Sequence, residues 1–291
     1  MNRRPALLGI VNVTEDSFSD GGRYLERDAA LAHARAMAAQ GAEIIDLGAA
    51  ASNPDVRPVS PELEIERLAP LVDILTHDGL NLSIDSFSPQ TQCWALARGV
   101  KYLNDVHGFP RPEIYPALAA SRCRLIVMHA LPPTEPAEPG DRTPGDVFDR
   151  ILAFFEARIA ALCEAGIARH RLILDPGMGF FLGRKPETSF FVLRRIPELK
   201  RAFDLPLLVS VSRKSFLRAI TGRTPADSGP ATLAAELFAA SQGVDYIRTH
   251  DPAALGDALA VMQSLELART WERPETAPAQ FLQRFGENPL L

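Results

Sequence analysis

Eight short apolar segments, separated by helical patterns, constrain the fold of this chain more than any other feature. Each is about the length of a strand and rich in Ile, Leu and Val. In chain order they are ALLGIVNV, EIIDLG, LNLSIDSF, KYLNDV, RLIVMH, RLILDPG, LPLLVSVSRK and DYIRTH. Near-continuous apolar runs are typical of parallel strands that are buried on both faces. We therefore expect eight parallel strands, the first at residues 6–13 and the last at residues 245–250.

Helical patterns rich in Ala, Leu, Arg and Glu lie between most of these segments. They span residues 27–41, 61–79, 89–99, 146–166 and 230–243. Several begin with Pro and are followed by Gly, the usual asymmetry of helix ends. A strand and a helix repeated eight times indicate an α/β fold, a single (β/α)8 TIM barrel. A doubly wound sheet is the alternative, but it would need a glycine-rich dinucleotide turn after the first strand, and NVTEDSFSDGG is not GxGxxG.

The length of 291 residues does not decide the number of domains, because an α/β barrel of about 250 residues forms one domain. We expect residues 1–270 to form one barrel and residues 271–291 to form a C-terminal tail, whose weak periodicity leaves its order open. Residues 129–146 are rich in Pro and charge, which predicts a long loop after the fifth strand.

Charge and cysteine usage exclude several classes of protein. The formal net charge of −5 argues against a nucleic-acid binder, which needs a basic face. The three cysteines show no CxxC spacing, so neither a disulfide framework nor a structural zinc site is expected. The N-terminal apolar run ends at Asn12, too early to span a membrane, and no signal-peptide cleavage pattern follows it. We expect a cytoplasmic protein without nucleic-acid or membrane partners.

Polar residues stand at or just past the C-terminal ends of the eight segments. They are Asn12, Asp46, Asp85, Asn104, His129, Asp175, Arg213 with Lys214, and Arg248 with His250. Because all strands of a barrel point the same way, these ends converge on one mouth, where barrel enzymes perform their chemistry. A single Asp at a strand end is usually a turn residue or a helix cap, and Asp46 and His129 fit structural roles as well. The collection as a whole indicates a site.

The polar residues divide by charge along the chain. Carboxylates and amides follow the third, fourth and sixth segments, and Arg, Lys and His follow the seventh and eighth. The first group suits the ring N–H, amino and carbonyl groups of a flat heterocycle, and the second suits a phosphate group. Asn12 and Asp20 offer the oxygen ligands that Mg²⁺ accepts. No HExxH, GxSxG or P-loop pattern is present, so no nucleophile or zinc chemistry is indicated.

Seven ordered motifs resemble those of the dihydropteroate synthases. They are GIVNVTEDSFSDGG, IDLG, LSIDS, YLNDV, DPGMGF, VSVSRKSF and RTHD, and the resemblance covers roughly residues 7–265. It implies a single pterin-binding (β/α)8 barrel that joins 6-hydroxymethyl-7,8-dihydropterin diphosphate to 4-aminobenzoate. The products would be 7,8-dihydropteroate and pyrophosphate, in folate biosynthesis. The family also implies a homodimer and Mg²⁺ as cofactor.

The resemblance assigns site residues position by position. The pterin would be held by Asp85, Asn104, Met128, Asp175, Phe180 and Lys214, and the catalytic residues among these would be Asp85, Asn104, Asp175 and Lys214. The diphosphate would be held by Asn12, Arg248 and His250, with Mg²⁺ on Asn12 and Asp20, and Asp20 would also help to close the first loop. The aminobenzoate would be bordered by Ser52, Pro54, Phe181, Arg213, Lys214 and Ser215.

Departures from the usual family pattern resemble the sulfonamide-insensitive (Sul-type) members. Glu15 replaces a proline, the second loop reads GAAASNPD, and FLGRKPETS is about two residues longer than its usual counterpart, around Phe181 and Leu182. A phenylalanine there would exclude the bulkier sulfonamide head while admitting the flat aminobenzoate carboxylate. Two alternatives stay open: another pterin-binding barrel, such as a methyltetrahydrofolate-dependent methyltransferase, and a non-catalytic pterin binder.

Overall fold

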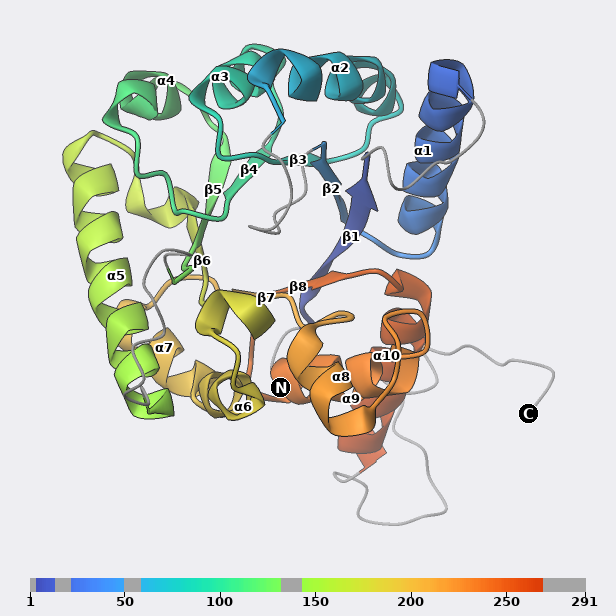
Figure 1. The fold of residues 1–291 in the computed structure, drawn as a ribbon, viewed down its shortest axis with the longest axis vertical. Coiled ribbons are helices and arrows are strands. Elements are labelled where there is room, and N and C mark those ends of the chain that lie inside the picture. Colours follow the sequence, from blue (N-terminus) through green and yellow to red (C-terminus); the bar gives the residue numbers. More distant parts are fainter. Residues whose placement is uncertain (1–3, 14–21, 50–58, 132–142, 269–291) are drawn as a thin grey trace.

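The computed structural model describes residues 4–13, 22–49, 59–131 and 143–268, which form a barrel of parallel strands inside a ring of helices (Figure 1). The strands are β1 (Ala6–Asn12), β2 (Ile44–Gly48), β3 (Leu82–Asp85), β4 (Tyr102–Asp105), β5 (Arg124–Met128), β6 (Leu172–Asp175), β7 (Leu208–Val209) and β8 (Tyr246–Thr249). Their order in the sheet is β6-β5-β4-β3-β2-β1-β8-β7. A parallel bridge between Leu174 and Leu207 brings β6 beside the segment that leads into β7. The predicted (β/α)8 barrel is confirmed.

The helices of the described ranges include each of those predicted from the sequence, together with four short helices and the longer α10. The α-helices are α1 (Gly22–Ala39), α2 (Pro61–His77), α3 (Pro89–Ala97), α4 (Tyr115–Ala120), α5 (Pro144–Glu164), α6 (Pro186–Arg194), α7 (Ile196–Phe203), α8 (Ser215–Thr221), α9 (Gly229–Ser241) and α10 (Pro252–Ala268). The 3₁₀ turns are η2 (Pro112–Ile114), η3 (Arg169–Arg171) and η4 (Gly179–Leu182). Because α5 begins at Pro144, the loop predicted for residues 129–146 ends slightly earlier than expected.

Side-chain caps explain where several helices begin. Ser60 and Ser88 each accept a hydrogen bond from a backbone N–H of the first turn of α2 and α3. Thr143 and Asp146 form a reciprocal capping box at the start of α5. In each helix a proline occupies the first turn, where its missing N–H costs little.

Two apolar layers hold the barrel together. The larger one fills the space between the strands and the surrounding helices and includes Phe148 and Phe155. The smaller one lies inside the barrel and consists of Leu8, Ile44, Ile126, Ile173 and Leu208. These five side chains are at most 3% exposed, so they form a dry floor beneath the C-terminal ends of the strands. Burying each of them stabilises the fold by roughly 1.5–3 kcal/mol.

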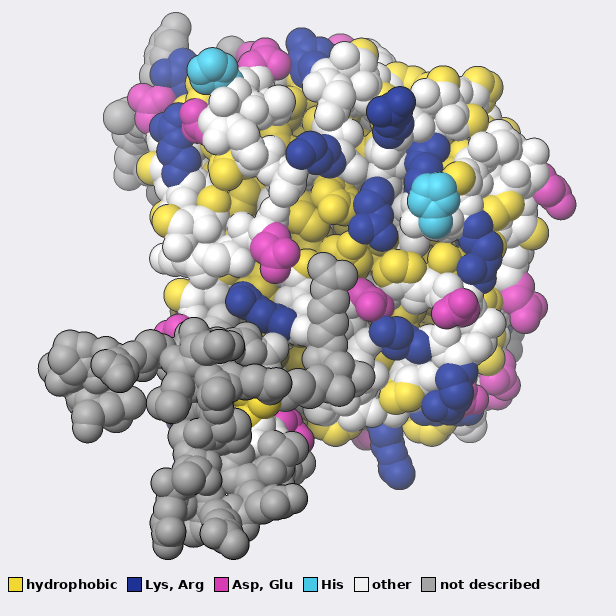
Figure 2. Space-filling view, turned by 180° about the vertical axis from the view of Figure 1, so that it is seen from behind, with side chains coloured by type: hydrophobic (Ala, Val, Ile, Leu, Met, Phe, Trp, Pro, Cys, Tyr) yellow, Lys and Arg dark blue, Asp and Glu magenta, His cyan; other side chains and the backbone are white. Residues whose placement is uncertain are grey.

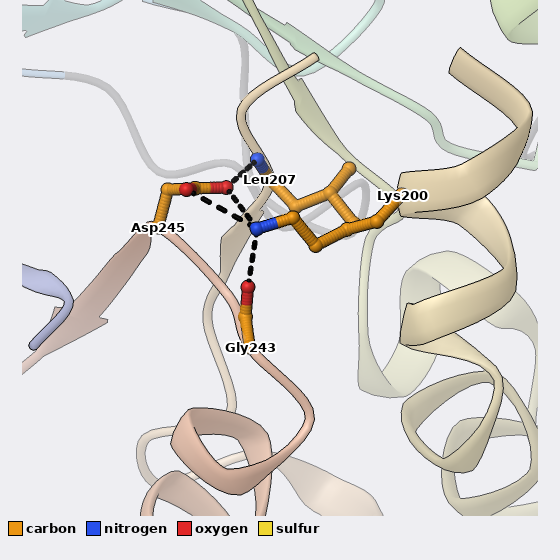
Figure 3. Close-up of polar contacts among 4 residues, drawn as sticks. All are labelled: Lys200, Leu207, Gly243 and Asp245. Atoms are coloured by element: carbon orange, nitrogen blue, oxygen red, sulfur yellow. Dashed lines mark hydrogen bonds and ion pairs between the residues drawn. The ribbon is translucent and has the colours of Figure 1, made fainter. Parts of the chain in front are cut away.

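The short β7 is anchored to β8 by one acidic residue. Asp245 accepts a hydrogen bond from the backbone N–H of Leu207 at 2.9 Å. The ammonium group of Lys200, on α7, lies 3.1 Å from the same carboxylate and donates to the carbonyl of Gly243 at 2.6 Å (Figure 3). These contacts fix the register in which Leu208 pairs with Tyr246.

Several predictions concern residues outside the described ranges. Asp20, Ser52 and Pro54 lie there, as do Glu15 and the tail at residues 271–291. Among the helices of the described ranges, none has the length and apolar character needed to cross a membrane.

Candidate active site

The strand register brings the predicted polar residues to one end of the barrel. Asn12 pairs with Gly48, Gly48 with Asp85, and Asp85 with Asn104, so these positions lie at one level on four adjacent strands. Asp175 pairs with Met128 at the ends of β6 and β5. The convergence expected from parallel strands is therefore present.

Arg248 links two carboxylates across the barrel interior. Its Nε donates to Asp46 Oδ2 at 2.5 Å, and its Nη2 donates to Asp85 Oδ2 at 2.7 Å. The exposed fractions of the Arg248, Asp46 and Asp85 side chains are 14%, 0% and 8%. Burial alone would lower the pKa of Arg248, but the two carboxylates outweigh it and raise that pKa. The guanidinium is therefore a permanent positive charge in a fixed position.

Burial makes the mouth carboxylates weak acids. It raises the pKa of Asp85 to about 7, although the charge of Arg248 opposes the shift. It raises the pKa of Asp175 to about 6, although a hydrogen bond from the Gly177 N–H at 2.9 Å opposes it. Strongly shifted acids in one cleft are typical of functional sites.

Buried oxygen atoms of Asn104 and Asp46 have no hydrogen-bond partner among the described residues, Asn104 at the level of Asp85 and Asp46 one pair of residues earlier on β2. They are Asn104 Oδ1 and Asp46 Oδ1, on side chains that are 3% and 0% exposed. An unsatisfied buried polar atom costs about 1–3 kcal/mol, so a native protein seldom keeps one without reason. Asn104 faces the same level as Asp85 and can accept a hydrogen bond from a ligand.

The loop after β7 supplies the cations. Lys214 is half-buried at the start of α8, and burial together with the charge of Arg248 lowers its pKa to about 8. Arg213 has a φ of 57°, a conformation that costs a non-glycine residue about 1–3 kcal/mol. Its N–H donates to Thr232 Oγ1 at 3.1 Å, which helps to hold this conformation. The strained backbone directs two adjacent cationic residues to the mouth.

His250 is held as a neutral imidazole. Its Nδ1 lies 2.9 Å from the hydroxyl of Ser212, which also accepts the His250 backbone N–H at 3.2 Å. The Ser212 hydroxyl can donate to Nδ1, and in that tautomer the imidazole proton is on Nε2. Burial, reinforced by the charges of Arg213 and Arg248, lowers the pKa of His250 to about 3. In that tautomer the neutral His250 offers Nε2–H as a hydrogen-bond donor.

The turn η4 places two phenylalanines beside Lys214. The Phe181 ring is 9% exposed and packs with Val106 and Met128, whereas Phe180 is 41% exposed. The ring centroids of the two phenylalanines are 4.0 Å apart. The Lys214 ammonium lies 4.9 Å from the centroid of Phe181 and 5.7 Å from that of Phe180. Met128 therefore has Phe181 as a neighbour.

Glycine is required in DPGMG because the chain comes close to β5. Gly177 has a φ of 73°, and a Cβ there would lie 2.3 Å from the His129 carbonyl oxygen. A Cβ on Gly179 would lie 3.2 Å from Ser215 Oγ, so this turn also contacts the start of α8. His129 is 3% exposed and packs edge-on against Phe154, and burial lowers its pKa to about 4. Its Nδ1 lies 3.3 Å from the Pro176 carbonyl oxygen, so His129 contacts the DPGMG turn.

A buried polar network behind β3 and β4 was not foreseen. Glu64 of α2 accepts hydrogen bonds from Ser86 at 2.9 Å and Thr91 at 2.5 Å. Gln92 donates to Asp105 at 2.9 Å and to the Ser86 carbonyl at 2.7 Å. The network holds the loop that follows Asp85. Its only sequence signal was the pair of adjacent polar residues, Asn104 and Asp105, at the end of one strand.

The structure brings most of the predicted residues together. Asp85, Asn104, Asp175, Lys214, Arg248 and His250 are gathered at the mouth with Met128, Phe180, Phe181, Arg213 and Ser215. Asn12 is exposed at the end of β1. Asp46 and Ser212, which were not assigned to the site, bind Arg248 and His250 directly.

Comparison with known proteins identifies the family. A family model described as pterin binding enzyme matches residues 8–250. The chain is 59% identical over 266 residues to dihydropteroate synthase type-2 of Escherichia coli, covering 91% of this chain and 98% of that protein. It is 49% identical over 259 residues to dihydropteroate synthase type-3 of Escherichia coli, covering 89% and 98%.

Solved structures agree with the sequence comparison. The dihydropteroate synthase of Xanthomonas albilineans with 4-aminobenzoic acid has a TM-score of 0.82 at 36% identity, covering 90% of this chain and 93% of that chain. The dihydropteroate synthase of Burkholderia cenocepacia complexed with 7,8-dihydropteroate has a TM-score of 0.79 at 34% identity, covering 91% and 93%. The resemblance seen in the seven motifs is confirmed. The chain belongs to the pterin-binding enzymes and, within that family, to the dihydropteroate synthases.

Proposed function

We propose that this chain condenses 6-hydroxymethyl-7,8-dihydropterin diphosphate with 4-aminobenzoate, giving 7,8-dihydropteroate and pyrophosphate. The observation that carries the proposal is the division of the mouth into a buried carboxylate and amide side and a cationic side. Asp85, Asn104 and Asp175 form the first side, and Lys214 and Arg248 border the second. A ligand with a polar heterocycle and an anionic group matches both.

The pterin is assigned to the carboxylate and amide side. Asp85 binds Arg248 through Oδ2, and Asp175 binds the Gly177 N–H through Oδ1. The second oxygen of each carboxylate and Asn104 Oδ1 are then available to accept the ring N–H and amino hydrogens. Lys214 can donate to the ring carbonyl, and Met128 and Phe180 are assigned to the ring faces. Discrimination is strong at such a site, because a mispaired ligand leaves buried polar groups unsatisfied.

The diphosphate is assigned to Asn12, Arg248 and His250. Arg248 already has two carboxylate partners, so it contributes mainly fixed positive potential. His250 is assigned the role of a donor through Nε2–H, and after burial the charges of Arg213 and Arg248 contribute most to the lowering of its pKa. An uncharged donor, His250, and a fixed charge, Arg248, would together stabilise the negative charge of the pyrophosphate as it leaves.

Mg²⁺ is assigned to the same end of the barrel, on Asn12 and Asp20. The donor set fits the preference of Mg²⁺ for one or two protein oxygens plus substrate phosphates. Gly48 leaves space there, since a Cβ on it would lie 3.6 Å from Asn12 Oδ1. The described residues contain no group of three or more His, Cys, Asp or Glu side chains that could hold a metal without substrate. Mg²⁺ bound with the diphosphate would neutralise part of its charge.

The reaction needs no nucleophilic side chain. The bond between the pterin CH₂ and the diphosphate oxygen breaks, and positive charge develops on the electron-rich ring. Asp85 and Asp175, when ionised, stabilise that charge. The aminobenzoate nitrogen then forms the new C–N bond and loses one proton.

The aminobenzoate is assigned to Ser52, Pro54, Phe181, Arg213, Lys214 and Ser215, of which Ser52 and Pro54 lie outside the described residues. We propose that the ring pair of Phe180 and Phe181 makes the enzyme insensitive to sulfonamides, because these rings narrow the opening beside Lys214. A tetrahedral sulfonyl head with a substituent needs more room than a flat carboxylate.

We propose that the protein is cytoplasmic and forms a homodimer. Large apolar side chains are exposed on the late helices: Ile220 on α8, Phe238 on α9, and Val261, Met262 and Leu265 on α10. Exposed apolar clusters of this kind often mark protein interfaces. Light scattering of the purified protein would give the mass of a dimer, and a monomer at micromolar concentration would contradict the assignment.

The test of the proposed reaction is pyrophosphate release. Mixing the protein with the pterin diphosphate, 4-aminobenzoate and Mg²⁺ should release pyrophosphate, and omitting aminobenzoate should abolish the release. Tight binding of the pterin without release would favour a non-catalytic binder. Methyl transfer from methyltetrahydrofolate without release would favour a methyltransferase.

A further inference from the structure

A cavity of about 440 Å³ lies on the face of the barrel opposite the mouth. It lies between the turn from α3 to β4 and the turn from α4 to β5, and Leu96, Val100, Lys101, Arg122 and Arg124 are among its lining residues. Its volume falls within the range of about 300–1,000 Å³ that is usual for small-molecule sites. The assigned substrate positions do not use it.

The dry floor inside the barrel separates this cavity from the active site. Tyr102, in the cavity wall, packs against the floor layer of Leu8, Ile44, Ile126, Ile173 and Leu208 from the N-terminal side. Asn104, two residues further along β4, lies on the mouth side. A ligand in the cavity would therefore not touch the substrates.

Three cationic side chains line the cavity, and no acidic residue does. Within the described ranges, none of the three forms an ion pair with a carboxylate. Lys101 donates to the neutral amide of Asn81 at 2.7 Å. Arg124 donates to the Tyr246 hydroxyl and lies over the Tyr102 ring, with 5.9 Å to its centroid. The positive charge is left uncompensated in a chain whose net charge is −5.

Asp245, the neighbour of Tyr246 in the sequence, has partners other than Arg124. Asp245 is engaged by the Lys200 ammonium and by the Leu207 N–H (Figure 3). It therefore does not neutralise Arg124. On this side of the molecule, Lys and Arg side chains gather around exposed apolar atoms (Figure 2).

The cavity walls are fixed by buried hydrogen bonds. Arg171, which is 8% exposed, donates to the carbonyls of Cys123 at 2.8 Å and Leu118 at 2.9 Å. It also donates to Ser121 Oγ at 2.9 Å. The Arg124 N–H donates to the Lys101 carbonyl at 2.9 Å and joins the two turns. A wall that is already ordered loses little entropy when a ligand binds.

We propose that this cavity binds a small organic anion, with a flat apolar body against Leu96 and Val100 and a phosphate or carboxylate group on Lys101, Arg122 and Arg124. The apolar wall would contact the body of such a ligand, and the three cations would bind its anionic group. The proposal does not depend on the proposed reaction, because no residue of the active site is involved.

Calorimetric titration of the full chain with 1-naphthyl phosphate tests the proposal. We expect binding that weakens as NaCl is added, and weaker binding of uncharged 1-naphthol and of inorganic phosphate alone. The double variant Lys101→Gln/Arg122→Gln should lower the affinity for 1-naphthyl phosphate at least tenfold. Both residues are exposed, so pyrophosphate release and thermal stability should stay at the wild-type level.

The matched control is Arg98→Gln. Arg98 lies at the end of α3, pairs with Asp73 and does not line the cavity. The Arg98→Gln variant should bind 1-naphthyl phosphate with the affinity of the wild type. Equal affinity of the double variant and the wild type would overturn the proposal, as would a loss of affinity shared by Arg98→Gln or the absence of binding at millimolar probe. None of these outcomes would change the pyrophosphate assay, so the cavity proposal can be refuted without refuting the proposed reaction.

Discussion

Replacing Arg248 by methionine should destabilise the protein more than any surface charge change. The substitution keeps much of the side-chain volume but removes the partner of two carboxylates that are 0% and 8% exposed. Breaking a buried ion pair from one side costs about 3–5 kcal/mol, because the remaining charge is uncompensated. Arg35→Met is the matched control: Arg35 pairs with Asp78 at 2.8 Å but is 53% exposed. Its loss should cost less than about 1 kcal/mol.

The size of the Arg248→Met effect should depend on pH. Burial raises the pKa of Asp85 to about 7, and Arg248 opposes that shift, so removing Arg248 raises the pKa further. When folding raises the pKa of a carboxyl, the protein loses stability as the pH rises from the pKa of the unfolded state to the pKa of the folded state. At pH 5.5 Asp85 is protonated in both proteins, so the deficit should be smallest there and should grow above pH 7.

Urea unfolding followed by circular dichroism at pH 5.5 and pH 8 measures both effects. The double variant Arg248→Met/Asp85→Asn should recover part of the loss seen at pH 8, because it removes one uncompensated charge. The reasoning is refuted if Arg248→Met is no less stable at pH 8 than Arg35→Met, or if its deficit is larger at pH 5.5 than at pH 8.

Three further predictions concern activity. Lys214→Met should lower kcat/KM for pyrophosphate release at least 100-fold with an unchanged circular dichroism spectrum, and normal turnover would remove Lys214 from the site. The kcat/KM profile should rise through about pH 6–7 as Asp175 and Asp85 ionise and fall above about pH 8 as Lys214 loses its proton; a flat profile from pH 5.5 to 9 would contradict these roles. Phe181→Ala should lower the inhibition constant of a sulfonamide at least tenfold while aminobenzoate still turns over, with Phe190→Ala, at a 37% exposed position on α6, as control; unchanged inhibition would place the discrimination elsewhere.

Substitution tests the sulfonamide assignment more cleanly than deletion of the two extra residues. Leu182 is 2% exposed and belongs to the main core, so removing it would create a cavity. Losing a buried leucine costs about 2–5 kcal/mol. The Phe181 carbonyl also accepts the Leu131 N–H at 2.9 Å, a contact that a deletion would break.

The strands were predictable because burial on both faces leaves a strong sequence pattern. Segments such as RLIVMH are almost wholly apolar up to their last residue, and β5 occupies Arg124–Met128. The short helices α4 and α8 were not predicted, because six or seven residues make fewer than two turns and show no period. Tertiary packing rather than local pattern determines such helices.

The mouth residues were predictable, but their pairing was not. Parallel strands require their C-terminal ends to meet, so Asp85, Asn104 and Asp175 could be grouped from order alone. The ion pair between Arg248 and Asp46 joins residues that are 202 positions apart, and no local pattern reports it. Local sequence also did not indicate that Phe181 packs against Met128.

The amide oxygen of Asn104, which has no hydrogen-bond partner among the described residues, should accept a hydrogen bond from the pterin. Titrating the pterin diphosphate into the wild type and into Asn104→Leu tests it most directly, because leucine keeps the side-chain size and removes both polar atoms. We expect the affinity to fall at least tenfold while the free energy of unfolding is equal to or above that of the wild type, since a buried oxygen without a partner is removed. Unchanged affinity in Asn104→Leu would contradict the assignment of this end of the barrel to the pterin.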